Sequence, residues 1–112
     1  MDAPDSSGAD RVMMVFCTFP ERGDAVRIGT ALVESGLAAC VNVLPGVESI
    51  YRWEGKTEKS EEVLTIFKIP ADRFADFEKA LSRMHPYYVP EIVGINADSV
   101  SQAYAKWVCG QG

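Results

Sequence analysis

The sequence has little that suits a membrane or a nucleic acid. No apolar run approaches the ~18–20 residues that a helix needs to cross a bilayer, so no membrane-spanning helix is expected. Lys and Arg number 11 against 16 Asp and Glu, and the net charge is −5. This balance argues against a nucleic-acid partner and against an anionic membrane surface, because both select basic patches.

Cysteine is also scarce. Three cysteines, an odd number with no CxxC pair, fit a reducing compartment better than a disulfide scaffold, and a cytoplasmic protein is therefore expected. The start of the chain has neither a basic nor an apolar segment, which predicts a disordered tail over 1–10 rather than a secretory signal. Residues 11–112, in a chain that is 47% apolar, are expected to form a single domain with its own core.

The middle of the chain predicts a long β-hairpin. Pro45 lacks a backbone donor and Gly46 tolerates positive φ, so a bulge or bend is expected within the first arm. The polar tip over 54–61 contains a glycine and is interpreted as too long for a two-residue turn. The arms are residues 40–44, continued by 47–53, and residues 63–69.

The second arm of this hairpin is apolar on both faces. Because side chains alternate along a strand, one face carries Val63, Thr65, Phe67 and Ile69 and the other carries Leu64 and Ile66. A chain of 112 residues has too few helices to cover both faces of such a sheet. Another copy of the chain is the economical cover, so we expect an oligomer, with Tyr51 and Trp53 packing at the interface.

The chain before the hairpin predicts one strand and one helix. A continuous apolar run over 11–18 indicates a central buried strand. Proline suits the first position of a helix, and a buried stripe at helical spacing follows Pro20. A helix is therefore expected from Pro20 to a stop at Gly36.

The chain after the hairpin predicts a helix, a strand and a last helix. The second helix starts at 70 and ends at His85, because a residue before a proline avoids the α conformation. A short strand over 91–97 follows, and Ser99 with Gln102 has the spacing of a capping box that opens the last helix. The order βαββαβ with an extra C-terminal helix predicts an α+β, ferredoxin-like antiparallel sheet with both main helices on one side.

Few side chains offer catalytic or metal-binding chemistry. No nucleophile–base pair and no phosphate-cradling loop is visible, so an enzyme is not expected. His85 is the one imidazole, and it is either a helix-terminal residue bound to a backbone carbonyl or a metal ligand. Met84 offers a thioether, although its place on the apolar stripe of the second helix favours core packing.

Two cysteines stand at strand ends. Cys17 ends the first strand and Cys40 begins the second. Each is either a small buried hydrophobe or a thiolate for an ion such as copper or zinc. The end of the first strand and the end of the second helix need not touch within one subunit, which leaves open a Cys17–His85 site shared between subunits.

Other polar residues give weaker signals. Glu91 lies between Pro90 and an apolar strand and, with Tyr87, is a candidate for an additional ligand or for the lining of a cleft between subunits. Lys68 is a candidate for the same cleft, where it would hold an anion. Glu62 is interpreted as part of a solvated rim.

Short segments along nearly the whole chain, from about Val12 to Trp107, resemble the CutA divalent-cation tolerance proteins. The ordered set is specific, whereas any one fragment is weak; Cys40 and Trp107, which fall in it, are interpreted as structural or interface residues. The segments are Ala38-Ala39-Cys40-Val41-Asn42, Pro45-Gly46, Ser49-x-Tyr51-x-Trp53-x-Gly55, Lys68, His85-Pro86-Tyr87, Pro90-Glu91-Ile92 and Tyr104-x-x-Trp107.

This resemblance implies a copper site at Cys17, Met84 and His85. Bacterial relatives have paired histidines before Pro-Tyr, and Met84 departs from that pattern. Methionine is softer than imidazole and favours cuprous over cupric copper, so divalent binding is expected to be weaker unless a group such as Glu91 completes the shell. Zinc or another divalent cation is the alternative ion.

The resemblance also implies an assembly and a function. The expected protein is a non-enzymatic homotrimer, similar in architecture to the PII signalling proteins, that binds copper (Cu2+) or related ions and takes part in the response to metal ions. The alternative is a PII-like signalling or adaptor module that binds a small ligand or a partner protein in clefts between subunits.

Overall fold

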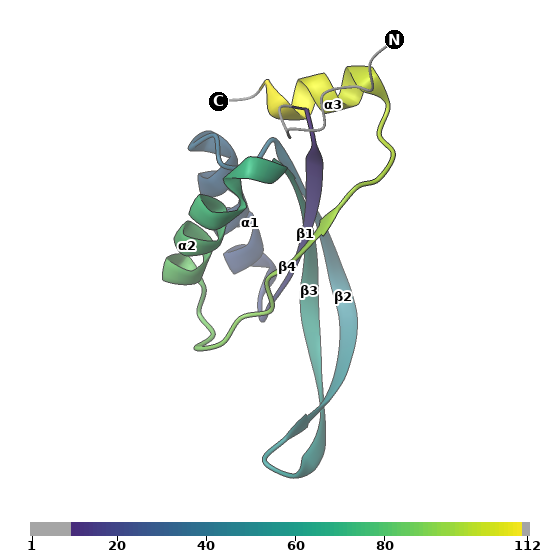
Figure 1. The fold of residues 1–112 in the computed structure, drawn as a ribbon. Coiled ribbons are helices and arrows are strands. Elements are labelled where there is room, and N and C mark those ends of the chain that lie inside the picture. The colour runs from purple at the N-terminus through teal and green to yellow at the C-terminus, as the bar shows by residue number, and fades with distance from the viewer. Residues whose placement is uncertain (1–9, 111–112) are drawn as a thin grey trace.

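The computed structural model describes residues 10–110, so most of the tail expected over 1–10 lies outside the described residues, as do residues 111 and 112. The order of elements confirms the α+β, ferredoxin-like prediction (Figure 1). The elements are β1 (Val12–Phe19), α1 (Arg22–Glu34), β2 (Cys40–Trp53), β3 (Lys56–Pro70), a 3₁₀ turn η1 (Ala71–Arg73), α2 (Phe74–Met84), β4 (Val93–Asn96) and α3 (Gln102–Cys109).

The four strands form one antiparallel sheet in the order β2-β3-β1-β4. Figure 1 shows α1 and α2 together on one side of this sheet, while α3 lies across one end of it. The distal hairpin, formed by residues 47–62 of β2 and β3, projects from the opposite end. The molecule is therefore elongated and measures 55 × 27 × 23 Å along its principal axes.

The main core lies between the sheet and the two helices. The first predicted face of β3 is buried here, and Phe67 meets Phe77 of α2 edge to face with ring centroids 4.9 Å apart. Gly29 lets α1 approach β2 closely, since a Cβ there would lie 3.1 Å from a methyl carbon of Val41. The buried side chains of β3 on this covered face are Val63, Thr65, Phe67 and Ile69.

The opposite face of the sheet, here called the open face, has no helix over its centre. Residues directly opposite each other in a ladder share a face, and the pairs Leu44–Leu64, Phe16–Ile66, Phe16–Val93 and Met14–Ile95 all fall on this side. Leu44, Val93 and Ile95 are exposed in the single chain, and the other four are half-buried. The open face is therefore Met14, Phe16, Leu44, Leu64, Ile66, Val93 and Ile95.

The hairpin differs from its prediction at the tip. The interruption of β2 is confirmed, because the register shifts between Leu44 and Val47 and Gly46 has φ of 81°. The prediction of a long tip was wrong: Glu54 and Gly55, with φ of 51° and 80°, make a two-residue turn. The first arm was predicted as far as Trp53, but the distal part of β3, residues 56–62, is polar and largely exposed, so no apolar pattern marked it as strand.

Several element boundaries also differ from the predictions. Helix α1 begins at Arg22 with Glu21 as its N-cap, whereas Pro20 was expected to be its first residue. Strand β4 is shorter than the predicted 91–97. These differences fall at element ends, where local propensity and side-chain patterns carry the least information.

Helix α3 begins later than predicted. Its N-cap is Ser101, whose hydroxyl accepts a hydrogen bond from the Tyr104 backbone nitrogen at 3.3 Å, and the capping box expected at Ser99 does not form. The helix buries Ala105 and Val108 against Val12 and Ala39 in a small second core. On its exposed side the Tyr104 and Trp107 rings stack with centroids 5.7 Å apart.

Candidate functional site

His85 lies where the end of β1 meets the end of α2. It is the C-cap residue of α2, its Nε2 lies 2.8 Å from the Thr18 carbonyl oxygen, and its ring stacks on Phe19 at a centroid distance of 4.5 Å. Whether these two ends meet within one subunit was left open by the sequence. The structure shows that a single chain brings them into contact.

Both ring nitrogens of His85 are engaged. The Tyr87 backbone N–H donates to Nδ1 at 3.0 Å, so Nδ1 is the unprotonated nitrogen and Nε2 carries the hydrogen that it donates to Thr18. Burial lowers the pKa of His85 below its ordinary 6.5, and the Thr18 carbonyl, Asp24 and Glu62 oppose this shift only partly. The ring is therefore neutral near pH 7 and acts as a bridge between two backbone segments.

Cys17 lies inside the main core. Its side chain is fully buried beside Val15 and Phe19, and its Sγ donates a weak hydrogen bond to the Thr18 carbonyl oxygen at 3.8 Å. Burial first, and then the negative charges of Glu91 and Glu62, raises the pKa of the thiol to about 12. The free thiol therefore stays protonated at neutral pH.

Met84 packs against the same core, as its place on the apolar stripe predicted. The three residues implied as copper ligands thus lie near one end of the sheet, but as placed they do not fit a copper ion. The thiol is fully buried, both ring nitrogens of the imidazole are hydrogen-bonded, and the thioether packs against the core. Across residues 10–110, no three His, Cys, Asp or Glu side chains gather closely enough to hold a metal ion.

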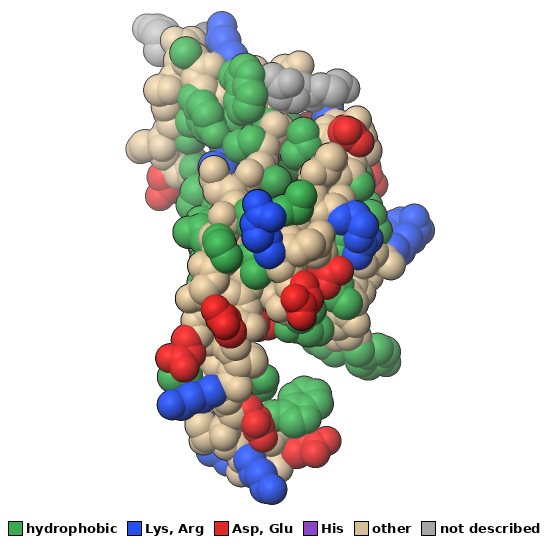
Figure 2. All heavy atoms as spheres, turned by 180° about the vertical axis from the view of Figure 1, so that it is seen from behind, with side chains coloured by type: hydrophobic (Ala, Val, Ile, Leu, Met, Phe, Trp, Pro, Cys, Tyr) green, Lys and Arg blue, Asp and Glu red, His purple; other side chains and the backbone are tan. Residues whose placement is uncertain are grey.

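A groove of about 960 Å³ lies just outside this buried cluster. Figure 2 shows the hollow between the hairpin and the main body, with hydrophobic side chains on both sides of it. Three carboxylates and four aromatic rings line it, and none of its described lining residues is basic. The lining is Thr18, Ser49, Ile50, Tyr51, Trp53, Glu58, Glu62, Tyr87, Tyr88, Val89 and Glu91.

One wall of this groove is fixed by a hydrogen bond from the Tyr87 hydroxyl to Glu62 Oε2 at 2.5 Å. The pKa of Tyr87 is raised by burial and by this contact with Glu62. Interpreting Glu62 as a solvated rim residue was therefore wrong, because it is half-buried and tied to the segment before β4. Its partner lies 25 residues away in sequence, so no local pattern could have shown the contact.

The other candidate residues divide between two places. Glu91, Tyr87, Tyr51 and Trp53 come together in the groove. Lys68 does not join them: it lies further along β3, opposite Cys40 in the ladder, and donates to Asn42 Oδ1. Cys40 itself lies 3.6 Å from the Tyr104 hydroxyl, at the α3 end of the sheet.

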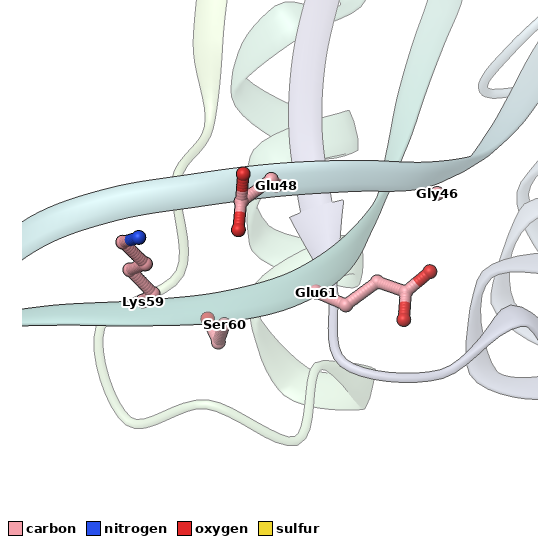
Figure 3. Close-up of a pocket in the computed structure, with 5 residues that line it drawn as sticks. All are labelled: Gly46, Glu48, Lys59, Ser60 and Glu61. Carbon is pink, nitrogen blue, oxygen red and sulfur yellow. The ribbon is translucent and has the colours of Figure 1, made fainter.

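A second, smaller hollow of about 390 Å³ lies at the bulge of β2. Glu48 and Glu61 are ladder partners there, yet in Figure 3 their side chains point apart, with Lys59 near the first. The hollow is lined by Gly46, Glu48, Lys59, Ser60 and Glu61. Because these carboxylates do not converge, the hollow has no evident chemistry.

Comparison with known proteins agrees with this architecture. The sequence profile of the CutA1 divalent ion tolerance protein matches residues 13–111. The chain belongs to this family. Within it, the chain is 39% identical over 95 residues to the divalent-cation tolerance protein CutA of Thermus thermophilus, which covers 85% of this chain and 92% of that protein.

Other CutA relatives are similarly close. The CutA homolog of Xenopus laevis is 36% identical over 106 residues, covering 95% of this chain and 70% of the relative. The crystal structure of CutA1 from Oryza sativa superposes with a TM-score of 0.86 at 30% identity, covering 89% of this chain and 92% of that one. None of the helices within residues 10–110 has the length and apolar character needed to cross a membrane.

Proposed function

We propose that this CutA1 family chain acts in divalent-cation tolerance as a non-enzymatic homotrimer in the cytoplasm. The family's description supports the link to divalent ions. The open face supports the assembly, because Val93 and Ile95 of the edge strand β4 are about half exposed there, at 47% and 49%, beside the apolar side chains of β1. A contiguous apolar face of this kind marks a surface that a protein partner covers.

Light scattering tests the assembly directly. The native protein is expected to have the mass of three chains of 12.3 kDa each at micromolar concentration. Val93→Lys places a charge on the open face and is expected to give monomers. Val26→Lys is the matched control, because Val26 is also exposed, at 38%, but lies on α1 away from the open face. A native mass of one chain overturns the assembly.

The cation is proposed to be copper, with zinc as the alternative. A trimer offers carboxylates and cysteines from three chains, so the proposal does not require all ligands to come from one chain. Isothermal titration with Cu2+ and Zn2+ tests it, and saturable binding to the assembled protein is expected. Binding no stronger than that of the unfolded chain removes the cation from the proposal.

The groove favours a second candidate function, a module that binds a small ligand or a partner protein. Ladder alternation places Thr18 and Glu62 on the open side of the sheet, so the groove would border a neighbouring copy. Its carboxylates repel phosphates, which favours cationic or neutral ligands over nucleotides. A thermal-shift screen of amines and nucleotides tests this, and stabilisation without metal by an amine alone is the expected result.

A further inference from the structure

The residues best suited to bind copper are already used inside this chain. We infer that Cys17 and His85 are structural residues here and not copper ligands, and that His85 is a positioning residue which holds the segment 86–91 against the end of β1. The inference rests on geometry within one chain. It stands whether or not the protein is a trimer or binds copper elsewhere.

The imidazole has no lone pair to offer. A metal binds an unprotonated ring nitrogen, and in His85 that nitrogen is Nδ1, which accepts the Tyr87 N–H at 3.0 Å. Nε2 carries a hydrogen and donates it to the Thr18 carbonyl at 2.8 Å. To coordinate a metal, the ring would have to break one of these bonds and leave its stack on Phe19.

The thiol points away from any accessible surface. Cys17 lies on the helix-covered face of β1, between Val15 and Phe19, with no exposed area. The adjacent Thr18 faces the groove, because successive side chains of a strand point to opposite faces. An ion in the groove would therefore have the Cys17 backbone, and not its sulfur, on its side of the sheet.

The same contacts make His85 a positioning residue for the segment that carries Tyr87. Thr18 of β1 binds His85, His85 binds the backbone of Tyr87, and the Tyr87 hydroxyl binds Glu62 of β3. This chain of three hydrogen bonds ties the start of the segment 86–91 to two strands of the sheet, β1 and β3. The segment forms one wall of the groove, so His85 shapes the groove without lining it.

The chain's single histidine allows a direct test on the native protein. Untagged protein loaded with Cu2+ is examined by pulsed electron paramagnetic resonance, in which a coordinated imidazole gives a modulation from its remote nitrogen. The expected spectrum lacks this modulation. Its presence overturns the inference, because no other residue of the chain can produce it.

Cys17 is tested in a background that lacks the other two thiols. In a Cys40→Ser, Cys109→Ser protein, adding Cys17→Ala is expected to change the Cu2+ dissociation constant less than about twofold. A loss of tenfold or more with the fold and mass intact overturns the inference.

Thiol labelling is a second test and needs no Cys17 variant. In the folded Cys40→Ser, Cys109→Ser protein, Cys17 should not react with iodoacetamide, and it should react after unfolding. Reaction in the folded protein contradicts its structural role.

The positioning role is tested by two substitutions at one site. His85→Asn keeps a carbonyl acceptor close to the position of Nδ1, whereas His85→Ala removes it. Hydrogen exchange at the Tyr87 amide is expected to accelerate at least tenfold in His85→Ala and to be largely restored in His85→Asn. Equal exchange in His85→Ala and the native protein would show that His85 does not hold this segment.

Discussion

The covered face and the open face of the sheet both carry large apolar side chains, but only one of them finds its cover inside the chain. On β3 the covered face is buried by α1 and α2, while the next residues along the same strand face outward. The polar chemistry follows the same division. Cys17 and His85 are sealed near the covered side, and the carboxylates of the groove are accessible on the other.

This difference separates stability from interaction. Side chains on the covered face contribute to the folding of one chain, and those on the open face and in the groove are available to other molecules. Substitutions at matched positions on the two faces therefore test this difference. Their expected effects decrease from the centre of the core to the groove wall.

The largest effect is expected for Phe67→Ala. Phe67 is fully buried and packs edge to face on Phe77, so its removal should lower the free energy of unfolding by about 3–5 kcal/mol. Ile66→Ala, one residue away on the open face, is the matched control and should instead weaken assembly. Denaturant unfolding at fixed chain concentration, with light scattering, measures both. Equal losses of stability would show that the two faces do not differ.

Alkaline pH is expected to reveal the buried thiol. The pKa of Cys17 is raised from 9.0 to about 12, so the unfolded chain loses this proton first. The corresponding stability is fully present below pH 9.0 and is lost as the pH rises from 9.0 toward 12, by about 1.4 kcal/mol per pH unit.

Cys17→Ala should therefore flatten the alkaline decline in the free energy of unfolding. Tyr87 has a raised pKa as well and contributes to the same decline, so the difference between native protein and variant is the quantity to compare. Denaturant unfolding in steps from pH 8 to pH 11 measures it. Parallel curves for the two proteins would mean that the thiol is accessible in the folded state.

A smaller effect is expected for Thr65→Val. The Thr65 hydroxyl is buried and donates to the Cys17 carbonyl oxygen at 2.8 Å, and valine keeps the shape but removes the donor. The loss should be about 1–2 kcal/mol in the free energy of unfolding. Thr57→Val, at the exposed end of the same strand, should change it by less than about 0.5 kcal/mol. If both variants behave alike, the buried hydrogen bond does not stabilise the sheet.

The order of elements, the bulge and the two-sided apolar strand could be predicted from the sequence, because each leaves a local pattern of apolar residues, proline or glycine. The distal part of β3 and the start of α3 could not, because an exposed polar strand lacks that pattern and two serines offered competing caps. The site depends on contacts between distant residues. His85 meets Thr18 across 67 positions and Tyr87 meets Glu62 across 25, and spacing alone specifies neither.

The smallest effect is expected at the groove wall, for Tyr87→Phe. The hydroxyl donates to Glu62 at 2.5 Å, but the site is partly open to water, so the loss in the free energy of unfolding should be about 1 kcal/mol. Tyr88→Phe is the control, because that side chain is fully exposed and its hydroxyl should contribute almost nothing. Hydrogen exchange along 86–91 should rise in Tyr87→Phe alone. If hydrogen exchange does not rise in Tyr87→Phe, the segment is held by His85 without the help of Glu62.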